Sequence, residues 1–168
     1  MGHDAKGVLY FMRLILLLLL LPFAVIAKLL GFGRSNMVDL PLDHPEMAQA
    51  IAEARTNLPE FRRFLETPDP GMENFAIKAA FPTGKNSEHI WVNTLKVNGS
   101  GFSGNLANDP RDLPGMAIGS PVEISEEMVS DWAYSSGGVF RGHFTTRVLL
   151  PHMSKRMRRQ VEAMFGWA

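Results

Sequence analysis

The sequence contains no cysteine, and this absence excludes several kinds of chemistry. Without cysteine the chain has no disulfide, no thiolate nucleophile, no cysteine-ligated metal and no lipoprotein cysteine. An excess of one charge is also missing, because 17 Lys and Arg residues balance 17 Asp and Glu residues. No global field therefore draws the protein to nucleic acid or to an anionic membrane surface. We expect no nucleic-acid partner, and any electrostatic contact must come from a local patch.

Motifs for metal binding or nucleophilic catalysis are missing as well. No two histidines have the spacing of a His-x-x-x-His helix or of a zinc ribbon. Ser103 lies in Gly101-Phe102-Ser103-Gly104, which lacks the spacing of a nucleophile elbow. We therefore expect no metal and no cofactor.

One long apolar run is present, from Leu14 to Ala27, interrupted only by Pro22 and flanked by basic residues on both sides. The basic start and the small-residue pattern Val25-Ile26-Ala27 indicate a signal peptide that is cleaved after Ala27. Alternatively, residues 8–30 reach the ~20 residues that cross a bilayer and remain as a membrane anchor. Either interpretation of residues 1–30 predicts a membrane-anchored or periplasmic, extracytoplasmic protein.

The remainder of the 168-residue chain has room for one folded domain. Residues 31–44 are expected to be a linker and residues 45–168 a single α+β domain. Between Pro45 and Glu66, apolar residues recur at spacings of three and four, which predicts a helix. Pro59 should break this helix, with Asn57 as a possible cap. A second helix is expected to begin at Ser154, close to the C-terminus.

Between the helices the pattern changes to the alternation of β-strands. A short turn from Ser125 is expected to lead into Asp131-Trp132, and the segment around Glu88 should be an interior strand. The expected strands are 75–81, 88–97, 102–106, 121–124 and 139–150. The predicted fold is thus α+β, with an antiparallel sheet of about five strands flanked by N- and C-terminal helices and preceded by one hydrophobic N-terminal helix.

Five short blocks occur in an order that resembles the YegJ-like family of bacterial domains of unknown function, DUF2314. The blocks are Glu88-His89-Ile90-Trp91-Val92, 102–110 with its Phe-x-Gly-x-Leu-x-Asn-x-Pro pattern, Gly119-Ser120-Pro121-Val122, Val129-Ser130-Asp131-Trp132, and Gly142 to Arg147. The resemblance covers about residues 73–150. Ser120 stands where the family usually has Asp. The resemblance implies a fold and often an exported or membrane-linked context, but it assigns no catalytic residue.

The polar residues most expected to converge are Glu88, His89, Asp131 and His143. A carboxylate beside an imidazole is the arrangement that general acid-base catalysis uses, so these four are the catalytic candidates. The structural alternative is that Asp131 caps a turn or pairs with an arginine such as Arg147, which would hold two strands together. A metal site formed by His89, His143 and a carboxylate is the least favoured of the three.

Binding candidates come from the aromatic residues and from the last predicted strand. Trp91 and Trp132 either line a recognition groove or lie in the core. Arg141, His143, Thr145 and Arg147 are expected on one strand face, where they either hold an anionic ligand or an acidic partner or form a solvated surface. The binding candidates are Trp91, Asp131, Trp132, Arg141, Thr145 and Arg147.

These observations favour an uncharacterised bacterial envelope protein that acts as a non-catalytic binding or interaction module. Its expected binding surface is the sheet face together with the turn-rich loop from Asn108 to Gly119. The expected partners are a protein or an anionic small ligand, and the membrane if residues 8–30 are retained. The alternative is a small envelope hydrolase that uses a carboxylate–histidine pair.

Overall fold

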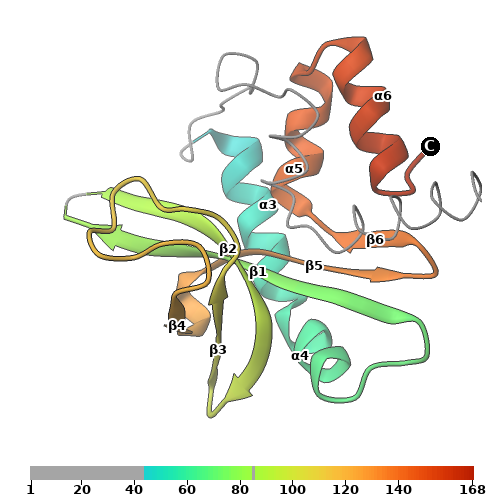
Figure 1. Ribbon diagram of the computed structural model, residues 1–168. Helices are drawn as coiled ribbons and strands as arrows, with labels where there is room; N and C mark the ends of the chain where they lie inside the picture. Colours follow the sequence, from blue (N-terminus) through green and yellow to red (C-terminus); the bar gives the residue numbers. More distant parts are fainter. Residues whose placement is uncertain (1–43, 85) are drawn as a thin grey trace, which may run out of the picture. The chain divides into compact units, whose positions relative to one another are not determined.

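The structure is a computed structural model and describes residues 44–84 and 86–168 (Figure 1). The hydrophobic segment predicted at residues 1–30 lies outside the described residues, as does the predicted linker apart from His44. No helix in the described part of the chain is long and apolar enough to cross a membrane. The signal peptide and the membrane anchor therefore both stay predictions.

Two helices precede the sheet, and the break between them lies where the sequence predicts it. α3 spans Pro45–Thr56 and α4 spans Leu58–Glu66. Pro59 is accommodated in the first turn of α4, where a helix needs no amide hydrogen from it. Asn57 lies between the helices but makes no side-chain capping bond, because its Nδ2 atom donates to the Glu53 carbonyl at 2.9 Å.

Six antiparallel strands form one sheet in the order β4-β3-β2-β1-β5-β6. The α+β class is confirmed, and the strand that contains Glu88 is interior as predicted. The strand count is one higher than expected, because the segment after the predicted turn is itself a strand. The bounds are β1 Met72–Thr83, β2 Asn86–Asn98, β3 Gly101–Leu106, β4 Pro121–Ile124, β5 Val129–Ser136 and β6 Val139–Gly142.

The single strand predicted over residues 139–150 is wrong. β6 ends at Gly142, and helix α5 follows at Phe144–Leu149. Gly142 and His143 both adopt positive φ angles, of 75° and 54°, which turn the chain out of the strand. Arg141, His143, Thr145 and Arg147 therefore do not share one strand face.

The C-terminal helix α6 spans Lys155–Met164 and confirms the prediction of a helix that begins at Ser154. The Ser154 hydroxyl oxygen accepts a hydrogen bond from the Met157 amide at 3.3 Å, as an N-cap does. Figure 1 shows α5 and α6 close together beside β6. A short 3-10 turn at Leu150–His152 connects them, and another at Glu126–Met128 precedes β5.

The main hydrophobic core lies between one sheet face and the two N-terminal helices. Phe61 of α4 is fully buried and packs its ring 5.2 Å from that of Trp132 in β5. The Trp132 indole nitrogen donates to the Ala54 carbonyl of α3 at 2.8 Å, which fixes that helix to the strand. Burial of an aromatic side chain contributes about 2–3 kcal/mol, so this contact is a main reason why α3 and α4 stay on the sheet.

Candidate binding site

Asp131 is fully buried in β5 and caps helix α5 from a distance of 13 residues along the chain. One carboxylate oxygen accepts from the Trp132 amide at 2.8 Å and the Phe144 amide at 3.0 Å. The other accepts from the Thr145 amide at 2.9 Å and the Thr145 hydroxyl at 2.6 Å. Burial raises the pKa of Asp131, while the bonds from Thr145 act against this rise. The carboxylate thus satisfies the open amide groups of a short helix.

The predicted pairing of Asp131 with Arg147 is not formed. Asp131 does act as a cap, but it caps helix α5 from within strand β5 and not a turn at its own position. Among the described residues, the three ion pairs within 4.0 Å involve other side chains. The Arg147 Nε atom donates instead to the Gly142 carbonyl at 3.0 Å, and its guanidinium lies 3.9 Å from the centre of the Trp167 ring. Burial and the neighbouring charge of Arg141 lower the pKa of Arg147.

His143 is buried among aromatic rings, at the point where β6 turns into α5. Its imidazole stacks 4.5 Å from the Phe165 ring and lies 5.1 Å from the Trp91 ring. Burial first, and then the charges of Arg147 and Lys78, lower the pKa of His143 to about 3. The ring is therefore neutral at ordinary pH and serves as a packing element between the C-terminal segment and the sheet.

His89 lies on the same sheet face as Trp91, because side chains two residues apart along a strand share a face. Its Nδ1 atom is 2.9 Å from the Ser130 hydroxyl oxygen, and this hydroxyl donates to the Lys78 carbonyl at 3.0 Å. Burial, and then the charges of Lys78 and Arg55, lower the pKa of His89 to about 4. Within the described part of the chain, neither His89 nor His143 is hydrogen-bonded to a carboxylate.

Glu88 points into the loop that follows β3 and holds it. The Glu88 side chain is only 8% exposed. Its carboxylate oxygens accept from the Arg111 amide at 2.8 and 3.0 Å and from the Asp112 amide at 2.9 Å. The charged head of Arg111 is mostly solvent-exposed and lies 3.8 Å from the same carboxylate. A buried carboxylate is thus used to fix two amides of a surface loop.

The loop from Asn108 to Gly119 has further bonds of its own. A carboxylate oxygen of Asp109 accepts from the Ile118 amide, and the Ser120 hydroxyl accepts from the Ala117 amide, both at 2.9 Å. The Ser120 hydroxyl therefore closes this turn with a bond of the kind that a carboxylate oxygen also makes. Ile118 is 47% exposed and is the one large hydrophobic residue exposed in the described ranges.

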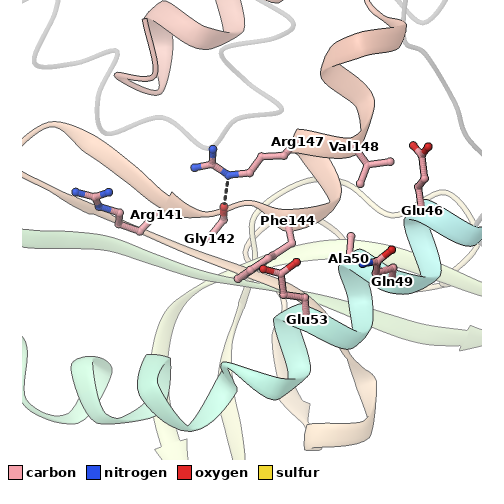
Figure 2. A pocket seen from close by; sticks show the side chains of 9 residues that line it. All are labelled: Glu46, Gln49, Ala50, Glu53, Arg141, Gly142, Phe144, Arg147 and Val148. Atoms are coloured by element: carbon pink, nitrogen blue, oxygen red, sulfur yellow. Dashed lines mark hydrogen bonds between the residues drawn. The ribbon is translucent and has the colours of Figure 1, made fainter.

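A second surface feature is a solvent-open groove of about 580 Å³ between α3 and the β6–α5 corner (Figure 2). Glu46, Gln49 and Glu53 line it from α3, while Arg141 and Arg147 line it from the opposite side. Ala50, Phe144 and Val148 supply apolar lining. Acidic and basic residues from different elements therefore line one groove, and Figure 2 shows them.

The structure separates the candidates that the sequence grouped. Trp132, Asp131 and Thr145 are buried, Trp91 is half-buried, and Arg141 and Arg147 are exposed in the groove. The described residues contain no group of three or more metal-ligating side chains of the His, Asp and Glu type. Sequence reasoning missed the α3 side of the groove, although residues 46, 49, 50 and 53 have the spacing of one helix face.

Comparison with known proteins gives a family but no activity. Residues 44–168 match the model of a family described as uncharacterized protein conserved in bacteria, DUF2314. The uncharacterized protein YegJ of Escherichia coli is 30% identical over 141 residues, covering 83% of this chain and 89% of the relative. No solved structure gives a significant match.

A putative ankyrin repeat protein of Neisseria meningitidis serogroup B is 26% identical over 107 residues. This match covers 64% of the present chain but only 42% of the relative, so the shared region is part of a longer protein there. The five sequence blocks, the family match over all of residues 44–168 and the identity to YegJ agree, and the chain therefore belongs to the DUF2314 family of uncharacterized bacterial proteins.

Proposed function

We propose that this protein is a non-catalytic binding module of the bacterial envelope and that the loop from Asn108 to Gly119 is its main recognition surface. The observation that carries the proposal is the use of buried Glu88 to hold the Arg111 and Asp112 amides. Burial of a carboxylate costs several kcal/mol unless hydrogen bonds compensate for it. Here the compensation fixes the shape of an exposed loop.

A fixed loop suits recognition, because a surface that is already ordered loses less entropy when it binds. The loop presents Ile118 to solvent, and an apolar side chain on a rigid frame is a suitable anchor for a pocket in a partner. Leu113 and Met116 of the same loop pack against the core, which adds to its rigidity. The loop therefore combines a stable base with an exposed apolar tip.

The hydrolase alternative requires a carboxylate that is hydrogen-bonded to a histidine, and among the described residues neither His89 nor His143 has such a bond. The oxygens of Glu88 and Asp131 accept hydrogen bonds from backbone amides and from Thr145. The two histidines have pKa values lowered to about 4 and about 3, so each is a weak base near neutral pH. The polar groups that acid-base catalysis would need are thus engaged in holding the fold together.

The Neisseria relative supports a binding role by its name alone. It is a putative ankyrin repeat protein, and ankyrin arrays are stacked repeats that form extended binding surfaces. A region similar to this chain in a protein of that name is consistent with a role in binding. The envelope location rests on the apolar run from Leu14 to Ala27.

The proposal is tested by quantitative affinity capture from envelope extract with the full chain in a nonionic detergent. Ile118→Asp places a charge at the loop tip and should reduce recovery of the captured protein at least about tenfold. Ala163→Asp adds the same charge to an exposed site of α6 and should leave recovery unchanged. Equal recovery with both variants, or substrate turnover by the purified protein, would overturn the proposal.

A further inference from the structure

The groove between α3 and the β6–α5 corner has charged residues of opposite sign on its two sides. Glu46 and Glu53 are both exposed on α3, and Arg141 and Arg147 are exposed on the other side. None of the four belongs to an ion pair within 4.0 Å among the described residues. The two sides are thus not neutralised by direct contact with one another or with neighbours.

Arg147 is held in place although it forms no ion pair. Its Nε atom donates to the Gly142 carbonyl at 3.0 Å, and the Trp167 ring stacks on its guanidinium. A cation stacked on Trp gains about 0.5–2 kcal/mol from this contact. Within residues 44–84 and 86–168 the two terminal nitrogens of the guanidinium make no hydrogen bond of their own, so the side chain is preorganised for an anionic group.

Binding by strand addition does not fit this corner, because the outer edge of β6 is already occupied. The Phe140 amide donates to the Phe165 carbonyl at 2.9 Å, and the Trp167 indole donates to the Phe140 carbonyl at 2.8 Å. The Gly142 carbonyl accepts from Arg147. A ligand in the groove must therefore be recognised through side chains and not through an added β-ladder.

The charge pattern selects the class of ligand. A polyanion such as a phosphate chain would be repelled by Glu46 and Glu53, and a polycation would be repelled by the arginines. An apolar ligand would strip water from four charges without compensation. A segment that carries acidic groups on one side and basic groups on the other meets both sides favourably.

We infer that this groove binds a polypeptide segment in which acidic and basic side chains alternate, so that its basic groups face α3 and its acidic groups face Arg141 and Arg147. In an extended peptide, successive side chains point to opposite sides, which matches two oppositely charged walls.

The inference deepens the proposed function and rests on it, since a peptide groove presupposes a binding module. The test is isothermal titration calorimetry of the full chain in a nonionic detergent with capped peptides of about six residues. The probes are an alternating Glu-Lys peptide, a block peptide of the same composition, an all-Glu, an all-Lys and an all-Ser peptide. Free glutamate and free lysine complete the set.

The alternating peptide should bind at least about tenfold more tightly than every other probe. Arg141→Glu should weaken its binding about tenfold. The double variant Glu46→Lys and Glu53→Lys should transfer the preference to the all-Glu peptide, a change that loss of folding would not produce. Glu66→Lys and Arg159→Glu alter exposed charges on α4 and α6 outside the groove and should leave binding unchanged.

The inference would be overturned if the alternating peptide bound no more tightly than the all-Ser peptide. It would also be overturned if Arg141→Glu and the double variant Glu46→Lys and Glu53→Lys both kept the wild-type affinities for the peptides. Equal binding of free glutamate or lysine would also overturn it, because a polypeptide would then not be required. These outcomes are separate from the capture test: loop variants that lose the captured protein, with no peptide binding in the groove, would leave the proposed function intact and remove only this inference.

Discussion

His143→Asn tests whether the buried imidazole is a neutral packing element. The folded state lowers the pKa of His143 to about 3, from the ordinary value of about 6.5 in an unfolded chain. Between these two pH values the unfolded chain therefore binds more protons at this residue than the folded chain does. The contribution of the neutral imidazole to the free energy of unfolding is thus fully present above about pH 6.5. It is lost progressively as the pH falls toward 3.

The size of the effect follows from the same two pKa values. Between pH 7.5 and pH 5, this one group should lower the free energy of unfolding by about 2 kcal/mol. Asn tolerates the left-handed backbone that His143 adopts and has no titrating group in this range. The variant should be less stable than the wild type at pH 7.5, because it loses the ring contacts with Trp91 and Phe165. This deficit in the free energy of unfolding should shrink by that amount on acidification, because only the wild type loses the contribution of the imidazole.

The measurement is urea unfolding followed by circular dichroism at several pH values between 5 and 7.5. His152→Asn is the matched control, because it removes an exposed histidine and should keep the wild-type pH dependence. A gap between the wild type and His143→Asn that stays constant over this range would refute the reasoning.

Three further substitutions test the structural roles assigned above, each by chemical denaturation. Asp131→Asn places an amide NH₂ against backbone donors and should lower the free energy of unfolding by about 3–5 kcal/mol; a loss below about 1 kcal/mol would contradict the capping role. Gly142→Ala should lower the free energy of unfolding by more than about 2 kcal/mol, because a Cβ atom at this position would collide with the Trp132 carbonyl. The control Gly138→Ala brings its Cβ atom near no neighbour and should lower it by only about 1 kcal/mol. Equal losses in the two variants would refute the steric argument. Thr94→Gly should stabilise the fold by up to about 1 kcal/mol, because Thr94 has a φ of 53° that a β-branched residue rarely adopts; destabilisation would show that its hydroxyl matters more than the strain.

The parts of the fold that local sequence signals determine were predictable. The break at Pro59 and the start of the last helix at Ser154 follow from the chemistry of proline and of a capping hydroxyl. The β2–β3 hairpin follows from the turn residues between Asn98 and Gly101. Each of these signals acts within a few residues, so no knowledge of tertiary contacts was required.

The parts that depend on distant contacts were not predictable. β5 is buried along almost its whole length and includes Ser130, Asp131 and Ser135, so it lacks the apolar and polar alternation of a half-exposed strand. Helix α5 is too short to show a helical period, and its first turn is capped by Asp131, which lies in another element. Alternating polar residues from Arg141 to Arg147 therefore resembled a strand.

The candidate site was predicted only in part, for the same reason. Glu88 was predicted as a catalytic candidate, but its hydrogen bonds reach residues 23 and 24 positions away, and these cannot be deduced from spacing. Arg141 and Arg147 were expected to lie together and do line one groove. The opposing carboxylates of α3 became apparent only when that helix was placed beside the β6–α5 corner.

The central claim is that Glu88 fixes a loop whose shape carries recognition. The Glu88 carboxylate accepts three hydrogen bonds from two backbone amides, those of Arg111 and Asp112. Glu88→Gln replaces it with a group that has one acceptor oxygen, so the loop should loosen. The decisive measurement is the affinity of the captured envelope protein for this variant, with hydrogen exchange of the Arg111 and Asp112 amides followed in the same sample. The account predicts faster exchange together with at least about a tenfold loss of affinity. Faster exchange with unchanged affinity would contradict it.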